Sequence, residues 1–185
     1  RQMCIRDRIY IADTMNNRLV SFTDKYEYKS EFNASGHLST PFSLVVNSRG
    51  VFVVVEKLAN RVALIDVKAK KVTYLSFDKC GGDKVIPYYV TIDRADNLYL
   101  IDRDTNKILV FDKNFEYIRS IKVRGVAVLA DVKVGWNGNI YILDTLSGSV
   151  YVLDPKGNIK LRFGQRGSRK NEFDFPVSLA VDSLG

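Results

Sequence analysis

The chain has few of the residues with which proteins build metal centres and nucleophilic sites. Of its 185 residues only one is histidine, His37, and two are cysteine, Cys4 and Cys80. A histidine cluster for zinc or iron, or a Ser-His-Asp set, cannot be assembled from this chain alone. Cys80 stands alone in an expected loop, so we expect no disulfide framework. We therefore predict no enzyme activity, no catalytic residue, no metal ligand and no cofactor.

Long hydrophobic runs are also missing. No apolar run reaches the ~18 residues that a membrane-spanning helix needs, so no transmembrane segment is predicted. The first eight residues, RQMCIRDR, lack the apolar core of a signal peptide. Their charges also fit no repeat, and we predict that residues 1–8 are a non-native leader. The formal net charge of +7 keeps the protein in solution or attracts acidic partners.

What the sequence does contain is one pattern that occurs four times. Apolar alternation leads to an acid, a short polar turn follows, and alternation resumes, in residues 9–22, 52–66, 98–112 and 140–154. The four acids are separated by 43, 46 and 42 residues, within the roughly 40–50 residues of a four-stranded propeller blade. Alternation with period two is typical of half-buried strands. The sequence therefore predicts an all-β propeller of four-stranded antiparallel blades.

The predicted propeller segment covers residues 9–185, and no second domain is expected. Its repeats are about 9–36, 37–82, 83–125 and 126–167, with a partial repeat at 168–185. Predicted strands of the complete repeats are 42–46, 51–55, 61–65, 72–77, 89–92, 98–101, 108–111, 117–123, 132–134, 140–143, 150–153 and 159–163. Residues 178–182 are predicted to open a fifth blade. We thus expect about four blades' worth of strands, cut from a longer propeller at both ends.

Two stretches resemble NHL repeats. They are YIADTMNNRLVSF at 10–22 and PVSLAVD at 176–182, the latter preceded by FGQRGSRKNEFDF at 163–175. The resemblance covers nearly everything after Arg8. It implies a propeller, commonly of six blades, whose loops at the blade-to-blade connections bind partners. The repeat style also suggests a bacterial protein, outside the cytoplasm or tethered to a membrane. The chain departs from the family pattern at Glu56, Lys107 and the pair Gly148-Ser149.

The polar residues of the repeated turns allow two interpretations. They could form a ring of ligand-binding groups, or each acid could cap backbone N–H groups and pair with the base that enters the next strand. We favour the structural interpretation. The residues concerned are Asp13, Asn17, Arg18, Glu56, Asn60, Arg61, Asp102, Asn106, Lys107 and Asp144.

The connections between blades are the predicted binding surface, because exposed loops on a rigid scaffold often carry function. Cations there could hold an acidic peptide or a phosphate backbone, and two neighbouring tyrosines could stack on bases or simply pack between blades. The candidate binding residues are His37, Lys84, Tyr88, Tyr89, Arg124, Arg166, Arg169 and Lys170.

Three functions remain open at this point. The favoured one is a non-catalytic scaffold that presents its inter-blade loops to a protein or peptide. The first alternative is binding of RNA or another nucleic acid through a basic top face. The second is a metal-dependent lyase or lactonase-like propeller enzyme whose active-site residues lie in missing blades.

Overall fold

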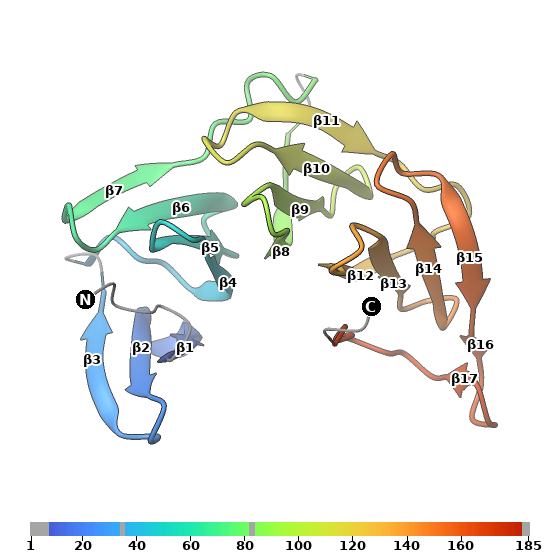
Figure 1. The fold of residues 1–185 in the computed structure, drawn as a ribbon, viewed down its shortest axis with the longest axis horizontal. Coiled ribbons are helices and arrows are strands. Elements are labelled where there is room, and N and C mark those ends of the chain that lie inside the picture. Colours follow the sequence, from blue (N-terminus) through green and yellow to red (C-terminus); the bar gives the residue numbers. More distant parts are fainter. Residues whose placement is uncertain (1–7, 34–35, 82–83, 183–185) are drawn as a thin grey trace. The chain divides into compact units, whose positions relative to one another are not determined.

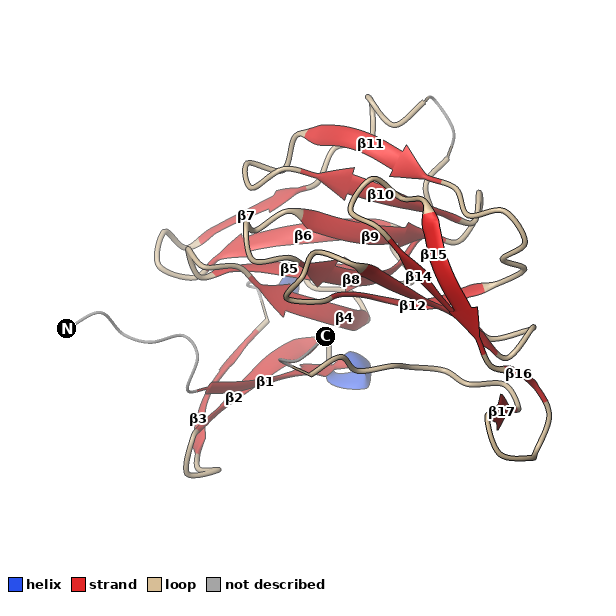
Figure 2. Ribbon diagram, turned by 45° about the vertical axis from the view of Figure 1, so that its right-hand side comes forward, coloured by secondary structure: helices blue, strands red, loops and turns tan. Residues whose placement is uncertain are grey.

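The computed structural model describes residues 8–33, 36–81 and 84–182 (Figure 1). Strands account for nearly all of its regular structure, and a short 3₁₀ turn follows the first strand (Figure 2). The chain forms two compact units, the first ending at Ser76 and the second beginning at Phe77. Among the described residues no helix is long and apolar enough to cross a bilayer.

The first unit contains two antiparallel sheets. A three-stranded sheet consists of β1 (Arg8–Asp13), β2 (Arg18–Thr23) and β3 (Tyr28–Phe32), with the 3₁₀ turn η2 (Thr14–Asn16) between β1 and β2. A four-stranded sheet consists of β4 (Pro41–Val46), β5 (Val51–Glu56), β6 (Arg61–Asp66) and β7 (Lys71–Tyr74). Buried side chains such as Leu19, Phe52 and Ile65 form one core in this unit.

The second unit contains two four-stranded antiparallel sheets. One consists of β8 (Pro87–Ile92), β9 (Leu98–Asp102), β10 (Lys107–Phe111) and β11 (Tyr117–Ile121). The other consists of β12 (Leu129–Val134), β13 (Ile140–Asp144), β14 (Ser149–Leu153) and β15 (Ile159–Phe163). A two-residue parallel ladder joins β16 (Gln165–Arg166) to β17 (Glu172–Phe173). The core joins the two large sheets through buried residues such as Ile101, Ile108, Ile142 and Leu153.

The register of the sheets repeats from one four-stranded sheet to the next. The first residue of each innermost strand lies opposite the acid of the second strand: Pro41 opposite Glu56, Pro87 opposite Asp102, and Leu129 opposite Asp144. A bulge follows at the same place in all three sheets. Leu129 therefore occupies the position of the prolines, and the lost proline changes neither the register nor the bulge.

The predicted all-β class and the strands of the complete repeats are confirmed, with shifts of a few residues at their ends. The predicted strand at 178–182 is wrong, since residues 178–182 contain no strand. A strand requires a ladder partner, and none lies beside this segment in the described part of the chain; instead the Ser178 hydroxyl and the Leu179 N–H donate to Asp131. Strand β1 begins at Arg8, while residues 1–7 of the predicted leader lie outside the described residues.

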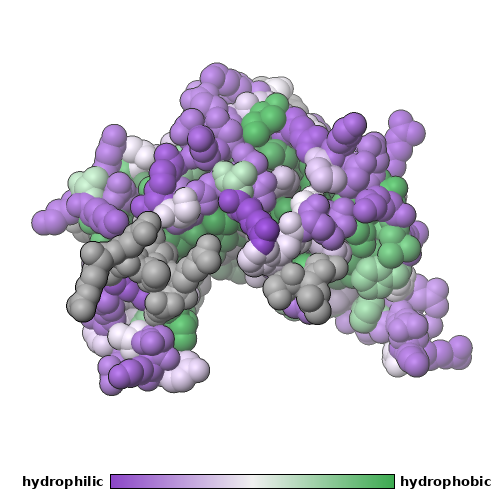
Figure 3. Space-filling model, in the orientation of Figure 1, coloured by the Kyte–Doolittle hydropathy of each residue, from purple (hydrophilic) through white to green (hydrophobic). Residues whose placement is uncertain are grey.

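The outermost strand of the last large sheet has an exposed apolar side. Ile159, Leu161 and Phe163 alternate along β15 and are 48%, 55% and 47% exposed. Hydrophobic surface is visible over this strand in Figure 3. The outer strands of the other sheets also expose large apolar side chains, namely Tyr28 of β3, Tyr74 of β7 and Ile118 of β11.

Candidate functional site

The acid of the second repeat, Glu56, is fully buried at the end of β5. One carboxylate oxygen accepts a hydrogen bond of 2.6 Å from Arg61 Nε, and the other accepts from the Ser39 N–H. Arg61 also donates to the carbonyl oxygen of His37 at 2.9 Å. A buried carboxylate is tolerated when it is paired and hydrogen-bonded. Glu56 therefore ties its own turn to the segment that leads into β4.

The acid of the first repeat, Asp13, lies in a more open place. Arg18 Nε donates to it at 2.7 Å and Asn16 Nδ2 at 2.9 Å, and the Arg18 guanidinium also pairs with Glu31. The hydrogen bond from Arg18, followed by that from Asn16, lowers the pKa of Asp13 below its usual value. Acid and base are thus paired within this turn.

In the second unit the acids are held by backbone and hydroxyl donors. Asp102 accepts from the N–H groups of Ile86 at 2.9 Å and Asp104 at 3.1 Å, and from the Thr105 hydroxyl. Arg18 and Arg61 both donate through Nε, a donor that lysine lacks. The side chain of Lys107 accordingly makes no hydrogen bond or ion pair within the residues that the structure describes.

Asp144 is fully buried and accepts from the N–H groups of Ala127 at 2.9 Å and Val128 at 3.0 Å. The Ser147 hydroxyl donates at 2.7 Å to Oδ2, the same oxygen that accepts from Ala127. Burial alone would raise the pKa of Asp144, but these hydrogen bonds hold it below its usual value. Glu56, Asp102 and Asp144 therefore each bind the segment just before the first strand of their own sheet, whereas Asp13 binds residues of its own turn.

The asparagines of the turns connect successive repeats. Asn17, Asn60 and Asn106 have φ values of 52°, 48° and 54°, a left-handed conformation that asparagine tolerates better than most residues. Asn17 Oδ1 accepts from the Thr40 N–H at 2.7 Å, and Asn106 Oδ1 accepts from the Leu129 N–H at 2.9 Å. Each of these two side chains thus caps the entry to the following sheet. These contacts favour the structural interpretation of the turn residues.

The predicted binding residues are distributed over both units. His37 lies in an exposed turn of the first unit, and the other seven belong to the second. Lys84 and Arg124 are exposed in segments that lead into β8 and β12. Tyr88 lies in β8 under the Arg103 guanidinium, 4.2 Å from the ring centre, and Tyr89 lies under Lys133 Nζ at 4.8 Å. Both tyrosines also pack against the core, so each already has protein contacts on its ring.

The remaining three predicted residues lie together in one loop, residues 164–175, which we call the arginine loop. Glu172 organises it: its carboxylate accepts from Gln165 Nε2 at 2.8 Å and from the Arg169 N–H at 2.9 Å. The bond from the Arg169 backbone, then that from Gln165, lowers the pKa of Glu172. Arg166 pairs with Asp174 at 3.3 Å and lies over the Phe175 ring, 4.3 Å from its centre. The loop therefore has a defined conformation.

The arginine loop rests on Gly148, in the turn between β13 and β14. Gly148 has φ +60°, and a Cβ there would lie 2.4 Å from the Phe173 carbonyl oxygen and 2.8 Å from the Arg166 nitrogen. The neighbouring Ser149 hydroxyl donates to the Gly164 carbonyl oxygen at 3.1 Å. The loss of the Asn-Arg pair at 148–149 thus makes room for the loop. The sequence shows that Gly148-Ser149 replaces the Asn-Arg pair, but it does not show the contact with the arginine loop.

A buried ion pair that sequence reasoning missed lies on β12. Asp131 is fully buried, and Lys133 Nζ lies 2.8 Å from its carboxylate. The second carboxylate oxygen accepts from the Ser178 hydroxyl at 2.8 Å and the Leu179 N–H at 3.0 Å. Both carboxylate oxygens of Asp131 therefore accept from donors within the chain. No group of three or more His, Cys, Asp or Glu side chains suited to a metal ion occurs among residues 8–33, 36–81 and 84–182.

Comparisons with known proteins support the architecture. A variant of virginiamycin B lyase from Staphylococcus aureus, catalytically inactive and solved with quinupristin, superposes with a TM-score of 0.67 at 16% identity over 85% of this chain and 52% of its own. A streptogramin B lyase superposes with a TM-score of 0.67 at 14% identity over 84% and 50%. These neighbours are propellers with four-stranded blades. The chain has a β-propeller fold.

Hydrazine synthase from Kuenenia stuttgartiensis also superposes, with a TM-score of 0.66 at 17% identity over 84% of this chain and 45% of its own. The chain therefore spans about half the length of the solved structures that it resembles. No model of a known protein family matches the sequence, and a search of curated proteins returns no significant match. Identities this low extend the likeness to the fold alone, and the NHL family is not confirmed.

Proposed function

We propose that the chain is part of an NHL-type binding scaffold that presents the arginine loop to an acidic segment of a protein or peptide. The observation that carries this proposal is how the loop uses its charges. Glu172 and Asp174 are engaged by donors of the loop itself. The side chains of Arg169 and Lys170 are exposed and make no hydrogen bond or ion pair within the described residues. Two cations are therefore left for a partner.

The loop also offers apolar contact area beside these cations. Phe173 and Phe175 are 37% and 50% exposed. Arginine and aromatic residues are enriched among the residues that dominate binding energy at protein interfaces. A loop that already has a fixed conformation loses less entropy on binding than a flexible one. Cations next to exposed aromatic rings suit a peptide with carboxylates near an apolar side chain.

The proposal is tested by binding a fluorescent peptide that contains several glutamates and one phenylalanine. The double variant Arg169→Ala, Lys170→Ala is expected to weaken binding by about 2- to 30-fold, because exposed charge pairs contribute ~0.2–1 kcal/mol each. The matched control, Lys25→Ala with Lys29→Ala, removes the same charge from exposed positions of the first unit. Equal affinity of both variants would show that the loop does not recognise the peptide.

Nucleic-acid binding is the outcome that would replace this proposal. A labelled single-stranded RNA is titrated at ~50 and ~200 mM salt with the same variants. A protein that neutralises several phosphates loses affinity steeply over this range. RNA binding that is tighter than peptide binding, and that falls with salt and with the loop variant, would move the assignment to nucleic acid.

A lyase is the second candidate, because two of the structural neighbours are lyases. That likeness concerns the fold, and the chain covers only about half of each lyase. Quinupristin, the molecule solved with the lyase variant, is the probe. Its consumption by this chain, followed by mass spectrometry, would make the protein an enzyme and displace the scaffold proposal.

A further inference from the structure

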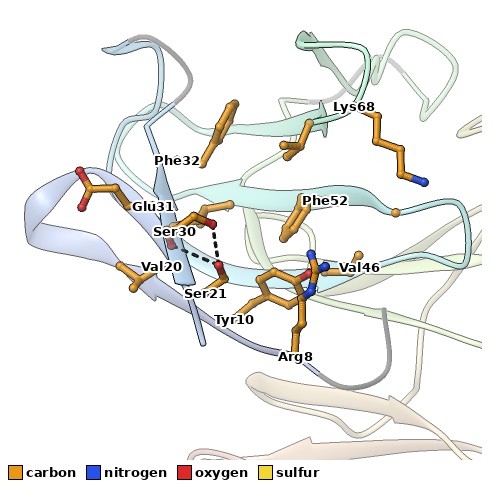
Figure 4. A pocket seen from close by; sticks show the side chains of 13 residues that line it. Arg8, Tyr10, Val20, Ser21, Ser30, Glu31, Phe32, Val46, Phe52 and Lys68 are labelled. Atoms are coloured by element: carbon orange, nitrogen blue, oxygen red, sulfur yellow. Dashed lines mark hydrogen bonds between the residues drawn. The ribbon is translucent and has the colours of Figure 1, made fainter. Parts of the chain in front are cut away.

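A cavity of about 370 Å³ lies in the first unit, between the sheet β1–β2–β3 and the sheet β4–β5–β6–β7 (Figure 4). The cavity opens to solvent, because the exposed residues Glu31, Val67 and Lys68 belong to its lining. It falls in the range of about 300–1,000 Å³ that small-molecule sites occupy. Its position is separate from the arginine loop, which belongs to the second unit.

The wall of the cavity is mainly apolar and partly aromatic. Tyr10 and Phe52 meet edge to face with ring centres 4.8 Å apart, and Leu19, Phe32 and Val46 extend this surface. Water in contact with such a wall finds few hydrogen-bond partners. Its displacement by an apolar group is therefore favourable.

The two serines and the glutamate of the wall already have hydrogen-bond or ion-pair partners in the protein. The hydroxyls of Ser21 and Ser30 lie 2.8 Å apart, and the Ser21 hydroxyl also donates to the Ser30 carbonyl oxygen at 3.1 Å. Glu31 forms an ion pair with Arg18, the first residue of β2, which does not line the cavity. The wall thus presents no strong uncompensated negative charge to a ligand.

Two cations line one side of the cavity, opposite Glu31, as Figure 4 shows. They are Arg8, at the start of β1, and Lys68, in the turn between β6 and β7. Lys68 is exposed, and its side chain makes no hydrogen bond or ion pair within the part of the chain that the structure describes. An anionic group placed here would lie beside two positively charged side chains while the rest of the ligand meets aromatic and aliphatic walls.

We propose that this cavity is a binding site for small aromatic carboxylates, with the ring against Tyr10 and Phe52 and the carboxylate between Arg8 and Lys68. The apolar wall selects a flat apolar body, and the cations select a negative charge over a neutral group of the same shape. This site goes beyond the proposed function and depends on different residues. Its failure and the failure of the arginine loop to bind peptide can therefore be told apart.

The test uses 2-naphthoate and its neutral counterpart 2-naphthamide, titrated into the chain by calorimetry or by ligand-observed NMR. We expect the carboxylate to bind with a Kd at or below about 1 mM, as its size allows, and the amide at least about fivefold more weakly. Lys68→Gln should weaken naphthoate binding up to about fivefold, because exposed ion pairs contribute modestly. The control Lys70→Gln, an exposed lysine of the same turn that does not line the cavity, should leave the Kd unchanged.

A second variant tests the location of the site. Val46→Phe adds volume to the wall and should abolish binding of both compounds, while thermal unfolding reports whether the fold is kept. Absence of naphthoate binding at 1 mM, or equal affinity for the amide, would overturn the proposal. Equal effects of Lys68→Gln and Lys70→Gln would also overturn it, because the carboxylate would then lie elsewhere.

Discussion

The contact between Gly148 and the arginine loop leads to a prediction for Gly148→Ala. The added Cβ would lie 2.4 Å from the Phe173 carbonyl oxygen and within 2.9 Å of two backbone atoms of Arg166. Neither neighbour is the flexible end of a side chain, so the loop backbone itself must shift. The left-handed conformation, with φ +60°, adds a cost because alanine rarely adopts it.

The magnitude follows from these two terms. Left-handed backbone costs an alanine about 1–2 kcal/mol, and forcing an additional methyl group into a packed place costs about 1–3 kcal/mol. Gly125→Ala is the matched control, since Gly125 has φ +84° but only one atom, the Tyr151 hydroxyl oxygen at 3.7 Å, near its would-be Cβ. The control should therefore lose only the conformational term, and Gly148→Ala should be about 1–3 kcal/mol less stable than it.

Two assays cover the two ways in which the strain can be relieved. Urea unfolding measures the loss if the loop stays in place. Trypsin digestion measures the other case, because a displaced loop exposes the peptide bonds after Arg166, Arg169 and Lys170 to faster cleavage. If Gly148→Ala matches Gly125→Ala in both the unfolding free energy and the cleavage rate, the loop does not rest on Gly148 and the reasoning is wrong.

Three further predictions concern the acids of the repeats. Arg61→Ala removes the partner of the fully buried Glu56 and should lower the unfolding free energy by about 2–4 kcal/mol. Lys107→Ala should change it by less than about 0.5 kcal/mol. If urea titrations give similar losses for the two variants, the contacts described for Glu56 and Lys107 are wrong. The pKa of Asp144 is lower in the folded protein than the usual value of about 3.9. Its stabilising effect is therefore present above about pH 4 and is lost as the pH falls through the folded value, so the urea midpoint should fall on acidification, and Asp144→Asn should flatten that fall. Arg18→Ala should lower the melting temperature through loss of the pairs with Asp13 and Glu31, and an unchanged melting temperature would return these turn residues to the list of ligand-binding candidates.

The strands could be predicted from the sequence because their signal is local. Runs such as FVVVE at 52–56 and IYILD at 140–144 alternate or stay apolar over the length of one strand, and acids at similar spacing indicate the repeat. The parallel ladder of Gln165–Arg166 with Glu172–Phe173 has two residues on each side and leaves no periodic pattern. Residues 178–182, SLAVD, contain a short apolar run, but such a run does not show whether a neighbouring strand is present.

The site was predictable only in part, because contacts between distant residues have no signature in one sequence. Arg166, Arg169 and Lys170 were found as a cluster of cations in a connection. Their support by Gly148 depends on a chain reversal that brings two loops together. The cavity beside Tyr10 and Phe52 depends on how two sheets pack, and nothing in the sequence distinguishes Lys68 from the neighbouring Lys70 and Lys71.

The asparagine contacts have a consequence for how such a protein can grow by duplication of its gene. Asn17 and Asn106 belong by sequence to one sheet but hold the first strand of the next. A duplicated segment cut at the sheet boundaries would keep every ladder but would place each asparagine opposite a new neighbour. A transplanted sheet keeps this contact only where its incoming strand offers an N–H at the same place, and it loses about 0.5–1.5 kcal/mol where the strand does not.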